Sequence, residues 1–170
     1  MTTAHSDQTS VPNSANAAKV VSVAFKRLDP NATIPKYHSD LAAGSDLTAC
    51  LPRAGMDESV TIAPRQIVKI PLGFACAIPN GYEGQVRPRS GLSTKHGISL
   101  PNAPGTIDAD YRGEMFIALI NLSDTPYTIT HGDRIAQLVI APVIRAQFVE
   151  VSDLDKTERG SSGFGSTGLR

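Results

Sequence analysis

Two aspartates, Asp108 and Asp110, stand two residues apart within residues 102–114 and are the first candidates for chemistry in this chain. They lie between a Pro-Gly turn and Gly113, and the apolar run 115–122 follows directly. A carboxylate held at the mouth of a strand can act as a general base or orient a metal ion. Because Asp, Gly and Pro are also the usual turn residues, this segment alone favours an ordinary acidic hairpin turn.

An arginine precedes a short helix predicted at residues 91–96, with Ser90 as its N-cap and Gly97 as its C-terminal stop. Arg89 offers a forked donor, and Ser90 and Gly91 offer a hydroxyl and backbone N–H groups, so an anion could bind here. The chain has no Walker A pattern. An ordinary N-cap beside a solvated arginine explains the segment equally well.

Residues 132–137 place charge and an amide in an otherwise apolar strand. Arg134 and Gln137 are three residues apart, so in a regular strand they point to opposite faces and cannot serve one site in the same way. On the simpler interpretation, residues 132–133 form a hairpin turn, and Asp133 and Arg134 form an ion pair on the surface. Asp46 follows a glycine at the start of another strand and carries little signal by itself.

Residues 155–170 are charged at first and then rich in glycine. Arg159 and the hydroxyl groups near it are chemically suited to phosphate oxygens, and the glycines let the backbone close around them. Phe164, the only aromatic residue of this tail, could stack on a base. By composition alone, a low-complexity tail is the simpler interpretation. The hydroxyl-bearing residues are Ser161, Ser162, Ser166 and Thr167.

Short alternations of apolar and polar residues run from Lys19 to about residue 151 and are separated by turn signals. Many short strands with Gly/Pro turns and no long helical pattern predict an all-β fold, as a closed sandwich, jelly roll or barrel. We expect residues 1–18 to be a disordered arm, 19–154 the β-domain and 155–170 a flexible tail. The expected strands are residues 21–25, 59–63, 66–70, 73–78, 83–87, 115–122, 127–131, 134–140 and 145–151.

The bulk composition excludes several classes of protein. A chain of 170 residues is expected to form one domain with a real core. Its 16 basic and 16 acidic residues balance, so no stable binding of nucleic acid or membrane is expected. Cys50 and Cys76 are predicted to be buried free thiols, which suits a reducing compartment. With no membrane-spanning segment or secretory signal, the expected location is the cytoplasm.

Donors for phosphates, a carboxylate for a water molecule and an aromatic ring for a base are together what a nucleoside triphosphate with Mg²⁺ requires. In order and spacing, five segments resemble the motifs of the trimeric dUTP pyrophosphatase (dUTPase) family, over most of the chain from about residue 24 onward. The resemblance implies a distorted jelly-roll or β-clip barrel, assembled as a homotrimer whose active sites each draw motifs from three subunits. The segments are residues 43–46, 88–92, 105–113, 132–137 and 159–168.

The resemblance implies that dUTP is the substrate and is hydrolysed to dUMP and pyrophosphate, which limits uracil incorporation into DNA and supplies dUMP for dTTP synthesis. Asp108 resembles the general base that activates the water attacking the α-phosphate. Tyr111 resembles the wall under the deoxyribose that leaves no room for a 2′-hydroxyl. Asn102 resembles the residue that hydrogen-bonds uracil, in a hairpin that includes the substrate-binding positions Thr106 and Ile107 and is too tight for a thymine methyl group.

The other motifs supply the phosphate-binding positions. Asp46 resembles the carboxylate that holds the Mg²⁺ cofactor through water. A tail that closes over ligand on another subunit can look disordered by composition and still be functional. The phosphate cradle that the resemblance implies consists of Arg89, Ser90, Gly91 and Gln137, and the closing tail contributes Arg159, Phe164, Gly165, Ser166 and Thr167.

One position departs from the family pattern. Ser162 stands where the family usually has glycine, and a serine at φ > 0 would cost about 1 kcal/mol in the ordered tail. We therefore expect weaker tail closure than in a Ser162→Gly variant, without loss of activity. A lower apparent substrate affinity in the variant would contradict this expectation.

Two alternative functions are compatible with the same fold. The related dCTP deaminases should carry a glutamate that acts on the base, but Glu114 falls after the third motif rather than at the catalytic position. A binding or regulatory protein with a decayed site should have lost Asp108 or Arg159, and both are present. The residues therefore favour the dUTPase.

Overall fold

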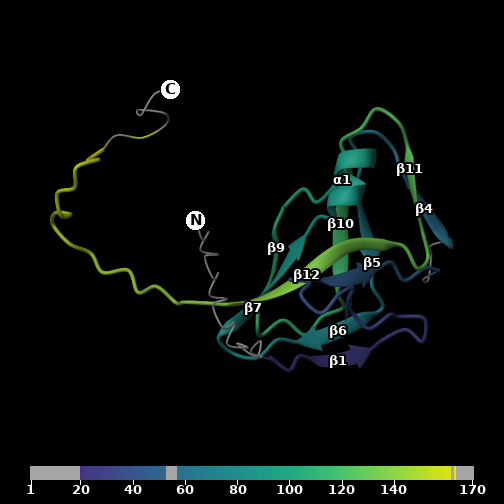
Figure 1. Cartoon of the computed structure of the whole chain (residues 1–170), viewed down its shortest axis with the longest axis horizontal. Coiled ribbons are helices and arrows are strands. Elements are labelled where there is room, and N and C mark those ends of the chain that lie inside the picture. The colour runs from purple at the N-terminus through teal and green to yellow at the C-terminus, as the bar shows by residue number, and fades with distance from the viewer. Residues whose placement is uncertain (1–19, 53–56, 162, 164–170) are drawn as a thin grey trace, which may run out of the picture.

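The computed structural model of the protein describes residues 20–52, 57–161 and 163. Within them the chain forms short antiparallel strands in four sheets, with one short helix (Figure 1). This confirms the all-β prediction with a single short helix. The helix is α1 (Ser90–His96), and the strands are β1 (Ala24–Arg27), β2 (Lys36–Tyr37), β3 (Ser45–Thr48), β4 (Ser59–Ile62), β5 (Ile67–Pro71), β6 (Phe74–Ala77), β7 (Tyr82–Arg87), β8 (Ile98–Ser99), β9 (Gly105–Ile107), β10 (Phe116–Asn121), β11 (Tyr127–Thr130) and β12 (Arg134–Pro142).

The largest sheet has five strands in the order β2-β3-β12-β7-β9, so β9 lies at its edge. A three-stranded sheet, β5-β10-β8, and the strand pairs β1-β6 and β11-β4 complete the fold. In β10 the residues Ile117, Leu119 and Asn121 are buried and those between them only partly so, as expected of a strand with one face on the core. Each fully buried Leu or Ile side chain contributes about 1.5–3 kcal/mol to this core.

Both cysteines are buried and free, which confirms the prediction from their apolar surroundings. Burial raises the pKa of the Cys76 thiol, and the Arg112 guanidinium offsets part of that rise. A buried thiol with a raised pKa is a poor nucleophile, so Cys76 is a packing residue. The helix of the described residues, α1, is too short to cross a membrane.

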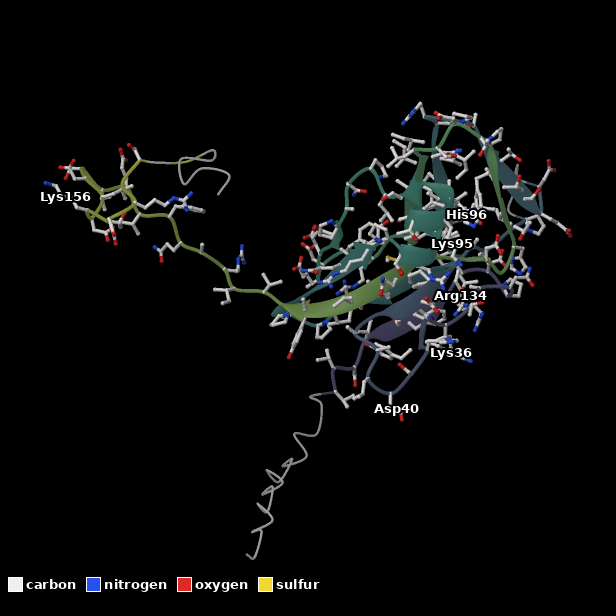
Figure 2. All side chains as sticks on the ribbon, turned by 45° about the horizontal axis from the view of Figure 1, so that its top comes forward. Lys36, Asp40, Lys95, His96, Arg134 and Lys156 are labelled. Atoms are coloured by element: carbon white, nitrogen blue, oxygen red, sulfur yellow. The ribbon has the colours of Figure 1, made fainter. Side chains whose placement is uncertain are left out.

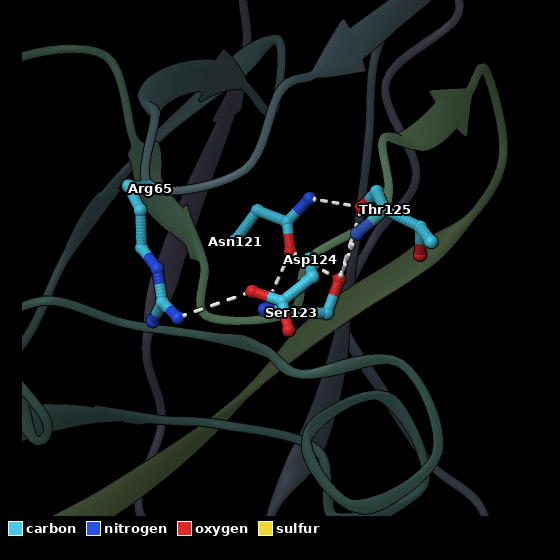
Figure 3. Close-up of polar contacts among 5 residues, drawn as sticks. All are labelled: Arg65, Asn121, Ser123, Asp124 and Thr125. Carbon is cyan, nitrogen blue, oxygen red and sulfur yellow. Dashed lines mark hydrogen bonds and ion pairs between the residues drawn. The ribbon is translucent and has the colours of Figure 1, made fainter.

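One buried polar side chain, Asn121, shapes the turn between β10 and β11 (Figure 3). Its amide nitrogen donates to the carbonyl oxygens of Ile62 and Thr125 at 2.9 and 2.8 Å. Its amide oxygen accepts from the backbone N–H and the hydroxyl of Ser123 at 2.9 and 2.7 Å. A buried amide with both ends satisfied stabilises the turn, so Asn121 has a structural role here.

Two sequence-based predictions about the elements are wrong. Ser90 is the first residue of α1 rather than its N-cap; the N-cap is Arg89, whose carbonyl oxygen accepts the first helical hydrogen bonds and whose side chain makes no capping bond. Gly97 ends the helix as expected, with φ of 68°. Residues 145–151 form no strand in this chain, because the segment runs away from the body and meets no other described strand (Figure 1).

Candidate active site

The turn after β9 gathers the residues expected to contact a nucleoside. β9 pairs with β7, and Thr106 lies opposite Gln85. Asp108 is the first residue after β9, and it is exposed. A cavity of about 230 Å³ lies beside it, lined by Thr106, Ile107, Asp108 and Tyr111 together with residues of β5 and β10. A second cavity of about 160 Å³ shares Thr106 and Ile107 and adds Asn102. The four residues predicted for uracil and sugar therefore lie together with Asp108, the predicted general base.

Tyr111 is held in place by the backbone around it. Its N–H donates to the carbonyl oxygen of Asp108 at 3.1 Å, and its hydroxyl donates to the carbonyl oxygen of Glu114 at 2.8 Å. A Cβ added at Gly113 would lie 2.5 Å from the Tyr111 hydroxyl oxygen, so only glycine lets the ring take this position. Tyr111 as a residue is 41% exposed, which leaves part of it available to a ligand.

The second aspartate of the turn has a different setting. Asp110 and Asp108 both border a separate cavity that also contains Glu83. Arg112, two residues after Asp110, donates to the carbonyl oxygens of Ala109 and Tyr111 at 2.6 and 2.8 Å. The guanidinium therefore stabilises the turn that presents Asp108.

The residues expected to contact phosphates gather around Asp46. One carboxylate oxygen of Asp46 lies 3.2 Å from Nε of Arg89, and the other lies 3.0 Å from Nη1 of Arg134. Arg89 also donates to the carbonyl oxygen of Arg134 at 2.8 Å. The Asp46 side chain is only 20% exposed, so these ion pairs are less screened than pairs on an open surface.

A β-bulge in β12 overturns the prediction that Arg134 and Gln137 face opposite sides. Arg134 is opposite Thr48, whereas Ala136 is already opposite Leu47, so β12 carries one extra residue between these pairs. Ile135 and Ala136 are both buried, which leaves Arg134 and Gln137 on the same outer face. The sequence reasoning assumed a regular strand, and two successive apolar residues between polar ones were the signal it missed.

Gln137 links β12 to the loop before α1. Its amide nitrogen donates to the carbonyl oxygen of Pro88 at 3.0 Å, one residue before Arg89. A Cβ added at Gly44 would lie 2.6 Å from the Gln137 amide oxygen, so this glycine makes room for the side chain. Ser90 and Gly91 follow as the first residues of α1. Arg89 and Gln137 therefore lie close together, and Gly44 and Arg134, to which sequence reasoning gave no role, lie beside them.

Arg134 does not form the surface pair with Asp133 that the sequence suggested. The Asp133 carboxylate instead accepts from the backbone N–H and the hydroxyl of Thr130 at 2.8 and 3.0 Å, which closes the turn before β12. Lys36, opposite Asp46 on β2, lies on the same side of the body as Arg134 (Figure 2). Basic side chains therefore surround the Asp46 carboxylate.

Asp46 fits the role of a carboxylate that holds Mg²⁺ through water. Both of its oxygens already have arginine partners, which leaves outer-sphere contacts as the available mode. Among the described residues, no group of three or more His, Cys, Asp or Glu forms a cage for a metal ion. Mg²⁺ commonly keeps several waters and is bound by one or two carboxylates plus substrate phosphates, and these residues suit that mode.

The residues expected to bind the nucleoside and those expected to bind phosphates lie around different strands of the largest sheet. β3, which carries Asp46, and β9 are three strand spacings apart, roughly 14 Å. Lys156 lies on the segment that leaves the body (Figure 2), and Arg159 follows it three residues later in the chain. The other expected tail residues and the N-terminal arm lie outside the described residues: Phe164, Gly165, Ser166, Thr167, Ser162 and residues 1–18.

Comparison with known proteins gives one family. The dUTPase family model matches residues 30–168. The deoxyuridine 5′-triphosphate nucleotidohydrolase of Desulfotalea psychrophila is 58% identical over 137 residues, 81% of this chain and 88% of the relative. That of Syntrophotalea carbinolica is 53% identical over 151 residues, 89% of this chain and 99% of the relative.

Solved structures with this fold include dUTPases of staphylococcal phages. A variant of the phage 80alpha dUTPase with dUpNHpp has a TM-score of 0.76 at 29% identity, over 87% of this chain and 99% of its own. A variant of the phage phi11 dUTPase, described with a structural Mg(II) ion, has a TM-score of 0.69 at 25% identity, over 79% of this chain and 99% of its own.

Proposed function

The chain belongs to the dUTPase family and is a hydrolase that acts on dUTP, and we propose that it does so with Asp108 as the general base. The observation that carries this proposal is the position of Asp108, exposed at a cavity that it shares with Thr106, Ile107 and Tyr111. A general base beside the nucleoside site can reach a water molecule next to the α-phosphate, because the α-phosphate is attached to the sugar. The products are dUMP and pyrophosphate.

The proposed step transfers one proton, forms one phosphorus–oxygen bond and breaks another. The Asp108 carboxylate accepts a proton from water as the water oxygen attacks the α-phosphorus. The bond from that phosphorus to the oxygen bridging the α- and β-phosphates breaks, and pyrophosphate leaves. Tyr111 lies against the deoxyribose and excludes a 2′-hydroxyl, while Asn102 hydrogen-bonds the uracil edge.

The cluster around Asp46 binds the triphosphate. Arg89 and Gln137, with the backbone and hydroxyl at Ser90 and Gly91, donate to phosphate oxygens. Asp46 holds Arg89 and Arg134 in position through its two ion pairs. A Mg²⁺ ion that arrives with the substrate would neutralise phosphate charge, and Asp46 would orient its waters. Arg159, Phe164, Gly165, Ser166 and Thr167 close over the bound nucleotide.

The active site is completed in a homotrimer. The resemblance of the five motif segments to those of the trimeric dUTPases supports this, because that family draws each active site from three subunits. The segment after β12 also leaves the body with large apolar side chains in solvent: Ile144, Phe148 and Leu154 are 94%, 96% and 85% exposed. Such side chains need a partner surface, and closed rotational symmetry gives every copy the same one.

Mixing two inactive variants tests the sharing of sites. We would co-express Asp108→Asn with Arg89→Met and measure pyrophosphate release from dUTP. If one site takes Asp108 and Arg89 from different subunits, each comes from an intact copy with a chance of one half, so about a quarter of the sites regain both. If both residues come from one subunit, no site is restored, and activity stays at that of the separate variants.

A substrate panel tests the function itself. Wild-type protein with Mg²⁺ is expected to release pyrophosphate from dUTP and to turn over UTP and dCTP poorly. Equal turnover of UTP would remove Tyr111 as the sugar discriminator, and preferred deamination of dCTP would establish the related enzyme class instead. In the cell, the proposed reaction takes place in the cytoplasm, limits uracil incorporation into DNA and supplies dUMP for dTTP synthesis.

A further inference from the structure

A lysine that the catalytic proposal does not use reaches the nucleoside cavities. Lys69 stands in the middle of β5, opposite Ala118 on β10. Its ammonium group lies 4.0 Å from the centroid of the Phe116 ring, a cation–π contact that fixes the end of a flexible side chain. Lys69 and Phe116 both line the cavity with Asp108 and the cavity with Asn102.

The cavity with Asn102 has the character of a base pocket. Its walls include the buried side chains of Val86, Leu100 and Ile117, which are 3%, 6% and 1% exposed. Few polar side chains interrupt this lining, and Asn102 and Thr106 stand on the β9 side. An apolar slot with a small number of placed polar groups is typical of sites for flat heterocycles.

The hydrogen-bonding capacities of these polar groups differ in a way that matters for base choice. An asparagine amide or a threonine hydroxyl can donate or accept, so either can adapt to uracil or to cytosine. A lysine ammonium has three donors and no acceptor. Uracil carries an acceptor oxygen at ring position 4, where cytosine carries a donor amino group. Opposite ring position 4, only the lysine side chain of the three is restricted to uracil, because it can donate but cannot accept.

We propose that Lys69, held over Phe116, donates to the 4-oxo group of uracil and thereby selects uracil over cytosine. This assignment rests on the proposed dUTPase function and adds a base-discriminating residue outside the five motifs. The Phe116 ring acts as the platform that directs the ammonium into the pocket. A cytosine in the same pose would place its amino group against a cation, so that two donors would face each other without an acceptor.

The test compares Lys69→Met, which keeps the length but removes the charge, with Lys69→Arg, which keeps both the charge and the contact with Phe116. The readout is kcat/KM for dUTP divided by that for dCTP. A hydrogen bond to a charged group corresponds to about a 10- to 100-fold change, so Lys69→Met should lower this ratio by that factor. Lys69→Arg should recover most of the ratio.

Two further variants of the full-length protein serve as controls. Lys26→Met removes an exposed lysine on β1 that lines neither cavity, and it should leave the ratio unchanged. Phe116→Leu removes the platform while keeping an apolar wall, and it should lower the ratio in the same direction as Lys69→Met, by less. Thermal unfolding of each variant verifies that the protein remains folded.

Equilibrium binding of deoxyuridine and deoxycytidine separates the possible outcomes. Lys69→Met should weaken deoxyuridine binding and leave deoxycytidine binding unchanged or stronger. If the variant binds both nucleosides like wild type and only loses affinity for dUTP, Lys69 contacts a phosphate and the inference is overturned. Absence of pyrophosphate release from dUTP by wild-type protein would instead refute the proposed function, a different result from an unchanged base ratio.

Discussion

The turn after β9 is held by hydrogen bonds between residues one to three positions apart, such as Tyr111 to Glu114 and Arg112 to Ala109. The cluster around Asp46 is held by contacts between residues 45 and 88 positions apart, from Arg89 to Arg134 and from Arg134 to Asp46. The first region is therefore specified by a short stretch of sequence, and the second by the register of β3 and β12. Substitutions in the two regions should affect different parts of the substrate.

The largest effect is expected at the chemical step of the local region. Asp108→Asn keeps the shape of the side chain and removes the proton acceptor, so kcat for dUTP should fall about 10²- to 10⁴-fold. The affinity for a non-hydrolysable dUTP analogue should change little, because the cluster around Asp46 is intact. Pyrophosphate release and analogue binding measure the two quantities. Undiminished turnover would remove Asp108 as the base.

Removing the tail tests whether the two regions suffice without a lid. Truncation before Arg159 should lower kcat/KM about 10²-fold or more, because charge-stabilising donors and the closing segment are lost. The fold should survive, since the last described strand ends at Pro142. Circular dichroism and gel filtration report the fold and assembly. Unfolding of the truncated protein would assign a structural role to the tail.

Gly113→Ala should act on sugar discrimination. The new methyl group must displace the Tyr111 ring, whose hydroxyl oxygen would lie 2.5 Å from it. We expect the preference for dUTP over UTP to fall about tenfold, equivalent to about 1.4 kcal/mol. The ratio of kcat/KM for the two nucleotides measures this. An unchanged ratio would mean that the ring does not exclude the 2′-hydroxyl.

Gly44→Ala is the matched change in the long-range region. Its methyl group would lie 2.6 Å from the Gln137 amide oxygen and displace the side chain that bonds Pro88. The loss of one hydrogen bond predicts a rise in KM for dUTP of about fivefold. Inhibition by deoxyuridine and the preference over UTP should not change. If both glycine variants shift the same parameter, the two regions do not serve separate parts of the substrate.

The smallest effect is expected for Tyr111→Phe. The hydroxyl bond to Glu114 is lost, but the ring remains, and a net contribution of about 1 kcal/mol to stability is the usual size for such a bond. Turnover of dUTP and discrimination against UTP should stay within about twofold of wild type. A large loss of discrimination would show that the hydroxyl, rather than the ring, positions the sugar.

The same contrast explains which features could be predicted from sequence. The strands with clear alternation were predicted, as were the all-β class and the turn residues around Asp108, because these depend on neighbours. The shared face of Arg134 and Gln137 was missed, because a bulge depends on the partner strand. Ser90 was taken for a cap because capping residues also occur inside the first turn. A place for Lys69 beside the nucleoside cavities could not be predicted from the sequence, because only the pairing of β5 with β10 brings it to Phe116.

The extra residue in β12 also makes the count of residues in this strand as important as their identity. A strand alternates with a period of two, so an odd insertion inverts the parity of everything beyond it. Deleting Ile135 would restore regular alternation with Arg134 and Gln137 still on the outer face, because Arg134, Ala136 and Gln137 would then stand opposite three successive residues of β3, but it would remove a buried side chain from the core. A strand one residue shorter here should therefore keep the face shared by Arg134 and Gln137, and its main cost should be the lost packing of one buried isoleucine.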